Sequence, residues 1–176
     1  PCYGYFSQLE KSWYICKGED EWAAKEAFNE LGLSIQFTHG HQNVGGFIGS
    51  RTTKHEWIQP MVGTWVRVVE TLSKVAVQYP QSADAGFTFC LQHKWHYVLC
   101  VVMDIAHEFA LVEWAIQKNL LPALLDVGEA DIDGDFQALL SHSVLKGGLG
   151  IHNLVELAGH AHDTLYNATN TLVNLL

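Results

Sequence analysis

One long helical pattern limits what this chain can fold into. From Thr53 to Tyr79 the apolar side chains recur at the spacing of one helix face, and Pro80 ends the pattern. Pro60, near the start, indicates either a kink or the first turn of the helix. The apolar face consists of Trp57, Met61, Trp65, Val68, Val69, Leu72 and Val75. A helix with one apolar face needs neighbours that cover it.

Two further helices are predicted to supply that cover. Ser82 or Asp84 can cap a helix that runs to about Met103, and a third helix runs from about Asp104 to Leu125. The three helices are long and the links between them are short. This arrangement predicts an antiparallel helical bundle.

The first fifty residues have a different character, typical of a small β-rich unit. Ser12 to Cys16 are rich in aromatic and β-branched residues and predict a strand, and the helix that follows is closed by Gly32. Leu33 to Thr38 and Val44 to Ile48 predict two more strands, with a turn at His39–His41 between them. The order is therefore β-α-β-β, and the fold class of the whole chain is predicted to be α+β.

The C-terminal part is predicted to be a helical extension. It begins with an acidic loop, Gly128 to Asp135, and a glycine-rich turn, Lys146 to Ile151. His152 or Asn153 then caps a helix that runs through Leu176. One face of this helix carries Leu154, Leu157, Ala158, Ala161, Leu165, Ala168, Leu172 and Leu175.

Charge and cysteine usage exclude several classes of protein. The net charge is −9, whereas a free-standing nucleic-acid binder usually shows a basic excess. Contact with nucleic acid would therefore be local, or made within a larger and more basic protein. The four cysteines form no CxxC pair, and neither a signal peptide nor a membrane span is evident. We expect an intracellular protein, cytoplasmic or nuclear, with reduced thiols and no membrane contact.

Three motifs follow one another in an informative order. They are GYFSQLEKSWYICK at Gly4–Lys17, NVGGFIGS at Asn43–Ser50 and SHSVLKGGLGI at Ser141–Ile151. In order and separation they resemble the segments that follow the catalytic aspartates in reverse transcriptases of eukaryotic mobile elements. The stretch from Glu56 to Val98 is similar to the helical thumb of that family.

The resemblance implies a division of the chain and a limited activity. Residues 1–52 would be a partial palm, residues 53–127 a helical thumb and residues 128–176 a loop with a helical extension. Such a chain positions an RNA/DNA primer-template and the incoming nucleotide. The family's YxDD segment is absent from this sequence. Because phosphoryl transfer needs metal ions held by those aspartates, Mg²⁺ is expected only with the missing segment, and this chain alone would not be catalytic.

Two groups of residues take on roles by this resemblance. Lys11 matches a lysine near the incoming triphosphate, where it would help to protonate the departing pyrophosphate. Its alternative is a solvated lysine at a strand end.

Val44, Gly45 and Gly46 match the turn that holds the primer end, and Ser50 and Arg51 would face primer phosphates. Glycine suits a site where two backbones come close together. The alternative interpretation is an ordinary β-turn.

Aromatic stacking offers a further candidate contact with the template. Trp95 lies beside Lys94 and His96 and is the best placed of the tryptophans to stack on a base. The alternative for Trp95 is packing in the helical core.

Two other functions remain open. A decayed element fragment would serve as a helical interaction module, binding a protein partner or a second copy. A small metal-binding protein would use the pairs His39 with His41 and His93 with His96, but no further ligands are evident, so no metal site is predicted. Residues 131–135 (DIDGD) lack the glycine and glutamate of a calcium loop and predict a solvated acidic loop.

Overall fold

A computed structural model describes residues 11–128 and 132–175 of the chain. The chain divides into two compact units, residues 1–57 and 58–176, and each is described by itself below. Helices and strands both occur, which confirms the α+β class. No helix among the described residues is long and apolar enough to span a membrane.

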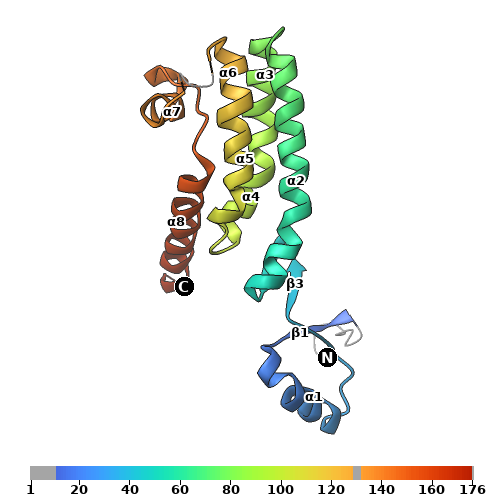
Figure 1. Cartoon of the computed structure of the whole chain (residues 1–176). Helices are drawn as coiled ribbons and strands as arrows, with labels where there is room; N and C mark the ends of the chain where they lie inside the picture. Colours follow the sequence, from blue (N-terminus) through green and yellow to red (C-terminus); the bar gives the residue numbers. More distant parts are fainter. Residues whose placement is uncertain (1–10, 129–131, 176) are drawn as a thin grey trace. The chain divides into compact units, whose positions relative to one another are not determined.

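The N-terminal unit combines two small sheets with one helix (Figure 1). Its elements are β1 (Trp13–Ile15), η2 (Gly18–Asp20), α1 (Glu21–Glu30), β2 (Gln36–Thr38), β3 (Gly40–Asn43) and β4 (Gly46–Gly49). Because β1 and β2 pair in parallel, the chain must cross over between them, and α1 makes the crossover. Tyr14, Phe28 and Phe37 pack edge to face, with ring centroids 5.0 to 5.8 Å apart, and so fix α1 on this pair.

The predicted end of α1 is confirmed in detail. Gly32 has a φ of +66°, and its N–H donates to the carbonyl of Asn29 over 3.0 Å. The N–H of Leu33 donates to the carbonyl of Phe28 over 2.9 Å. These two bonds form a Schellman motif, which satisfies the last carbonyls of the helix and favours glycine at the left-handed position.

The predicted turn between the last two strands of this unit is wrong. Residues 40 and 41 lie in an additional strand, β3, and the chain reverses at Val44–Gly45 instead. The reason lies in the glycines. Gly40 pairs with Gly49, and neither contributes a side chain to the alternating pattern from which a strand is predicted.

The second unit is helical, and its first helix, α2 (Arg51–Ala76), starts in the N-terminal unit. Pro60 lies inside α2, which excludes the first turn of the helix as one of its two expected positions. The elements that follow are α3 (Pro80–Gly86), η3 (Phe87–Leu91), α4 (Gln92–Val101), η4 (Ala106–Phe109), α5 (Ala110–Ala115), η5 (Ile116–Leu120), α6 (Leu121–Leu125), α7 (Gly134–Ser141), η7 (Val144–Lys146) and α8 (Leu154–Asn174). The π-helical turns η3 and η5 continue the helices around them, so the second and third predicted helices are confirmed. The predicted cap of the second helix is wrong, because that helix begins at Pro80 and contains both Ser82 and Asp84.

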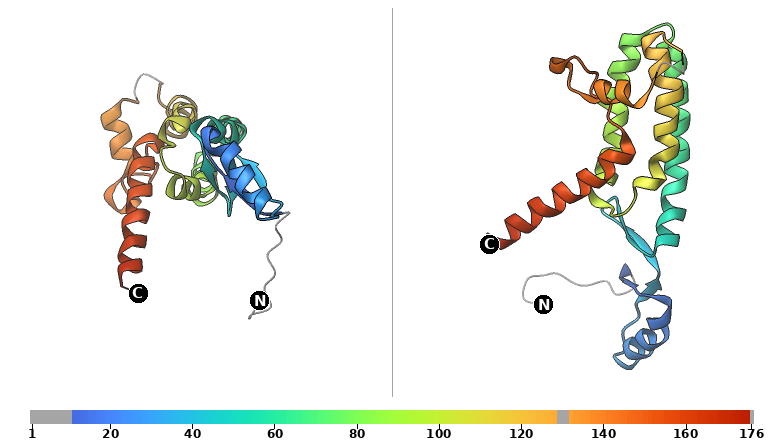
Figure 2. Two further views of the ribbon diagram at one scale, coloured as in Figure 1. Left: turned by 90° about the horizontal axis from the view of Figure 1, so that it is seen from below. Right: turned by 60° about the vertical axis from the view of Figure 1, so that its left-hand side comes forward.

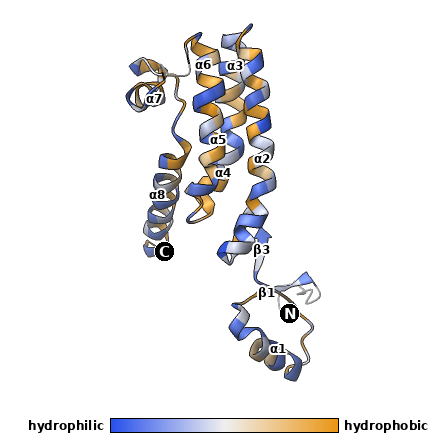
Figure 3. Cartoon of the chain, viewed as in Figure 1, coloured by the Kyte–Doolittle hydropathy of each residue, from blue (hydrophilic) through white to orange (hydrophobic). Residues whose placement is uncertain are grey.

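Large aromatic side chains fill the centre of this unit. Trp65 lies 5.5 Å from Phe109 and 5.9 Å from Trp95, measured between ring centroids, and Phe87 lies 5.9 Å from Trp95. All four are buried. Apolar stripes along the helices lie next to polar ones (Figure 3). Each fully buried side chain of this size contributes about 2 to 3 kcal/mol to stability, so this cluster is a substantial part of the core of the unit.

A short helix, α7, occupies part of the segment predicted as an acidic loop. The side chain of Asp133 caps it and accepts the backbone N–H of Phe136 over 2.8 Å. The glycine-rich turn that follows is confirmed as structural, because Gly147 and Gly150 have φ of +83° and +71°. A Cβ atom at Gly148 would lie 2.1 Å from the carbonyl oxygen of His142, so the turn excludes larger residues there.

A buried carboxylate joins three helices of this unit. Glu113 of α5, 6% exposed, accepts the side-chain amide of Gln137 from α7 and, over 2.7 Å, the backbone N–H of Leu154 at the start of α8. Of the two predicted caps, His152 and Asn153, Asn153 accepts the next two N–H groups of α8. Burial raises the pKa of Glu113, and its hydrogen bonds with Leu154, Gln137 and Gln117 only partly oppose this.

Replacing Glu113 with alanine should destabilise the helical unit by about 3 kcal/mol. The change leaves the Leu154 N–H and the Gln137 amide buried without an acceptor, and each such group costs about 1 to 3 kcal/mol. Urea denaturation followed by circular dichroism measures the loss.

Glu113→Gln is the matched control. The amides of Gln137 and Gln117 can rotate by half a turn and keep every hydrogen bond, so this variant should be much less destabilised than the alanine variant. Because the folded-state pKa of Glu113 is raised, its contribution to stability is greatest below the unfolded pKa and falls as pH rises through the folded pKa. The free energy of unfolding of the wild type, relative to Glu113→Gln, should therefore fall as the pH rises. A difference between the two proteins that does not change with pH would contradict a buried, titrating Glu113.

Candidate nucleic-acid interface

The β3–β4 hairpin carries the turn that the sequence singled out. Asn43 pairs with Gly46, which leaves Val44 and Gly45 as a two-residue connection. Their φ angles are +49° and +79°, and positive values at both positions define a type I′ turn. Val44 is 83% exposed, whereas Gly46 is buried. The hairpin therefore presents an apolar side chain and accessible backbone at its tip.

Val44 is an unusual residue for this position. Left-handed backbone suits glycine or asparagine, and a β-branched side chain there is a genuine outlier. Strain of this kind costs on the order of 1 to 3 kcal/mol and tends to occur where a local geometry serves a function. The tip is thus a candidate contact site on conformational grounds that are independent of its sequence motif.

Two glycines anchor the base of the hairpin to the start of α2. A Cβ atom at Gly40 would lie 2.4 Å from the hydroxyl of Thr53, and one at Gly49 would lie 2.3 Å from the Cα of Gly40. The carbonyl of His39 accepts the backbone N–H of Ser50 over 2.8 Å and the Thr53 hydroxyl over 3.2 Å. Only glycine permits this close approach, so the hairpin and the first turn of α2 are held together.

A second contact binds the middle of the hairpin to the next turn of α2. Phe47 stacks on Trp57 with ring centroids 5.2 Å apart and planes 23° apart. The indole N–H of Trp57 donates to the side-chain oxygen of Gln42 over 3.2 Å. Stacking and hydrogen bond together fix the orientation of the hairpin relative to α2. The sequence pattern places Trp57 on the apolar helix face but does not predict this contact.

Ser50 acts within the chain. Its hydroxyl accepts the backbone N–H of Thr53 over 3.3 Å and lies 2.9 Å from the Thr53 hydroxyl, which caps the N-terminus of α2. The predicted phosphate-facing role of its side chain competes with this cap. The sequence signal for this cap is a serine directly before the helical pattern.

Cations gather at the N-terminus of α2. Arg51 is exposed in the first turn, Lys54 follows, and the first turn contains no acidic residue, although Glu56 comes two positions after Lys54. The helix macrodipole is positive at this end, so cations here are unfavourable for the helix itself. The same arrangement favours an anion. The start of α2 is therefore a local positive site on a chain whose net charge is −9.

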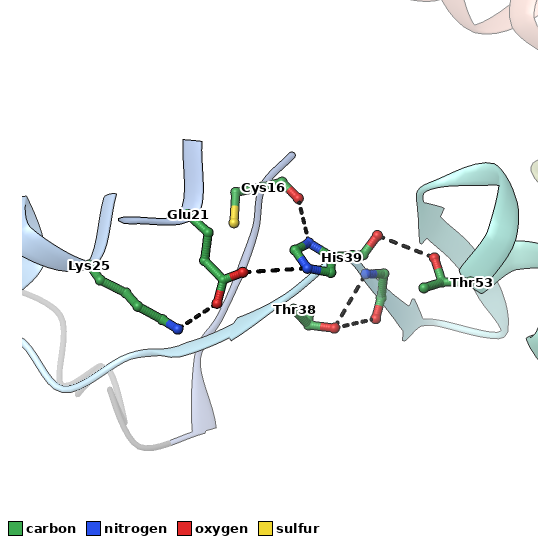
Figure 4. A network of polar contacts seen from close by, with 7 residues as sticks. Cys16, Glu21, Lys25, Thr38, His39 and Thr53 are labelled. Atoms are coloured by element: carbon green, nitrogen blue, oxygen red, sulfur yellow. Dashed lines mark hydrogen bonds and ion pairs between the residues drawn. The ribbon is translucent and has the colours of Figure 1, made fainter. Parts of the chain in front are cut away.

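A polar network meets the base of the hairpin through His39 (Figure 4). The ring nitrogens of His39 lie 3.2 Å from the carbonyl oxygen of Cys16 and 3.4 Å from the carboxylate of Glu21. Lys25 donates to the same carboxylate. This hydrogen bond and the charge of Lys25 hold the pKa of Glu21 below its usual range. His39 thus links β1, α1 and the base of the hairpin, a role that sequence spacing did not reveal.

Lys11 is exposed and precedes β1. Trp13, two residues later, stacks on His41 of β3 with ring centroids 4.6 Å apart. The strand that Lys11 leads into therefore adjoins the hairpin. The rest of its motif, residues 4–10, lies outside the described residues.

The assignment of Trp95 to base stacking is wrong. Its side chain is 1% exposed and packs against Trp65 and Phe87. A ring enclosed on both sides has no face left for a base, so the core-packing alternative holds. Lys94 beside it is exposed on α4, in the helical unit.

The histidine pairs do not assemble a metal site among the described residues. There, no three His, Cys, Asp or Glu side chains are placed to hold one ion. His39 instead contacts Glu21, and His41 stacks on Trp13. On α4, the ring of His96 lies 3.8 Å from the sulfur of Cys100.

Replacing Val44 with asparagine should stabilise the hairpin by about 1 kcal/mol, because Asn-Gly adopts the type I′ turn without β-branching. Hydrogen exchange of the β3 and β4 amides, followed by NMR, measures the gain. Val44→Thr keeps the branch and should leave exchange unchanged. Faster exchange in Val44→Asn would show that Val44 is not strained.

Comparisons of this chain with known protein families, with curated proteins and with solved structures found no match.

Proposed function

We propose that this chain is part of a reverse transcriptase of a eukaryotic mobile element, and that its hairpin and the start of α2 contact the primer strand. The support is the order of its three motifs along the sequence, together with the geometry of the second one. Val44 and Gly45 form an exposed reverse turn closed by Gly46, and Ser50 alone separates that hairpin from a 26-residue helix.

The observation that carries the proposal is the rigid link between the hairpin tip and a positive helix terminus. The hairpin is held to α2 at its base through Gly40, Gly49 and Thr53, and again through Phe47 and Trp57. A nucleic-acid strand that touches the tip would therefore meet the cations of α2 in a fixed geometry. Fixed geometry is what positioning a primer end requires.

The chemistry of each part fits a role in positioning. Backbone at a glycine turn can approach a sugar-phosphate backbone closely, and an exposed valine offers an apolar contact to a sugar. Arg51 suits a phosphate because its planar guanidinium binds two oxygens together. Lys11 would serve as a cation and proton source near a triphosphate. None of these groups holds catalytic metal ions, so the chain positions substrates and does not react them by itself.

Neutralising Arg51 tests this proposal. Arg51→Gln should weaken binding to a labelled RNA–DNA primer-template by roughly 3- to 10-fold, and it should reduce the slope of log affinity against log salt by about 1. Fluorescence anisotropy at several salt concentrations measures both quantities.

The matched control is Arg67→Gln. The chain has two arginines, so both variants remove the same charge from the same helix. Arg67 bonds within α2, to the carbonyl of Gly63 and to Thr64, and should contribute little to binding. If the two variants lose the same affinity, the effect comes from net charge and the proposed contact at Arg51 is contradicted. If the wild type does not bind even at low salt, the proposal is overturned.

A further inference from the structure

The last helix carries a seam with a period of 3.5 residues. Apolar positions along α8 alternate in steps of four and three, through Leu154, Ala158, Ala161, Leu165, Ala168 and Leu172, and the next step reaches Leu175. A straight helix that packs on a globular core follows a period of 3.6. A strict period of 3.5 over three heptads is typical of a helix that packs along a second helix.

Only the first part of this seam is covered by the chain's own bundle. Leu154 and Ala158 are 3% and 4% exposed, because α8 packs there against α4 and α5. The other end is open, with Leu165, Leu172 and Leu175 at 42%, 64% and 77% exposed. The two views of Figure 2 show the C-terminal part of α8 projecting from the helical bundle.

An apolar groove begins where the covered part of the seam ends. It lies between α4 and α8 and has a volume of about 350 Å³. Its lining is mostly apolar, with Cys100, Leu157, Ala161, Leu165 and Ala168 beside the polar side chains of His96, His160 and Thr164. The two alanines leave room for another backbone to come close, and the leucines offer side chains to fill the space. The groove is thus continuous with the exposed seam.

The charges around this surface favour a neutral, apolar occupant. Residues 164–175 contain no Asp, Glu, Lys or Arg, and none lines the groove. A charged partner helix would gain no ion pair here. The chain has a net charge of −9, but two copies can meet at this surface without placing like charges together. The uncovered end of α8 is itself uncharged, so it suits the uncharged groove of a second copy.

We propose that α8 is a self-association surface, in which the open end of one copy's seam packs into the α4–α8 groove of a second copy. Because the groove and the open end lie on the same helix, a two-fold axis near Leu165 lets each copy cover the other. Only the groove and the open end of one helix take part, so we expect a weak contact, with a dissociation constant on the order of 10 to 100 μM. The inference does not depend on the proposed contact with primer.

Sedimentation velocity of the full chain, from about 1 to about 300 μM, tests this proposal across the expected dissociation constant. The wild type should shift from monomer to dimer. Leu172→Lys places a charge in the seam and should weaken the dimer at least 10-fold. Leu172 is 64% exposed in the single chain, so the substitution should leave the helix content seen by circular dichroism unchanged.

Asn170→Lys is the matched control, because it adds the same charge on the opposite face of α8, about 160° away. This variant should dimerise like the wild type. A wild type that stays monomeric throughout the range would overturn the proposal. A dimer that Leu172→Lys leaves intact would overturn it equally, since the association would then use another surface.

Discussion

The N-terminal unit depends on the close approach of two backbones at the base of the hairpin. Gly40 and Gly49 lie so near each other that neither accepts a side chain, and the Thr53 hydroxyl fills the space beside Gly40. This contact brings the carbonyl of His39 to the first turn of α2. The strained tip at Val44 persists because the base and the Phe47–Trp57 stack together determine the conformation of the hairpin.

The helical unit is organised on a different principle. Its interior is aromatic and aliphatic, yet Glu113 is buried among the helices and holds the start of α8. A buried carboxylate costs desolvation energy, which its raised pKa reflects. The Glu113 carboxylate accepts hydrogen bonds from backbone and amide donors of two other helices. These bonds fix which end of α8 enters the bundle. The rest of α8 is left open to solvent, and the proposed self-association arises there.

Features that depend on a few neighbouring residues could be predicted from the sequence. Features that depend on tertiary contacts could not. Gly32 and Asn153 end and begin helices as expected, because capping depends on a few neighbouring residues. The burial of Trp95 depends on Trp65 and Phe87, which reach it only after the bundle forms. The strand β3 escaped prediction because half of its pairing partners are glycines without a side-chain pattern.

At the candidate interface, the turn could be predicted from the sequence, but the contacts that hold the turn in place could not. Val44, Gly45 and Arg51 were identified from their order along the chain. The hydrogen bonds of His39 join residues 23 and 14 positions apart, and no spacing rule links such residues. That support is what makes the turn and the helix terminus a single rigid element.

The most direct test of primer contact by the hairpin is photocrosslinking of the full chain to an RNA–DNA primer-template. The primer carries 4-thiothymidine at its 3′ end, and mass spectrometry identifies the crosslinked peptide. The account predicts crosslinks at residues 42–47 and at the first turns of α2, weakened by salt as phosphate contacts are. Crosslinks confined to the helical unit, or none at low salt, would contradict it.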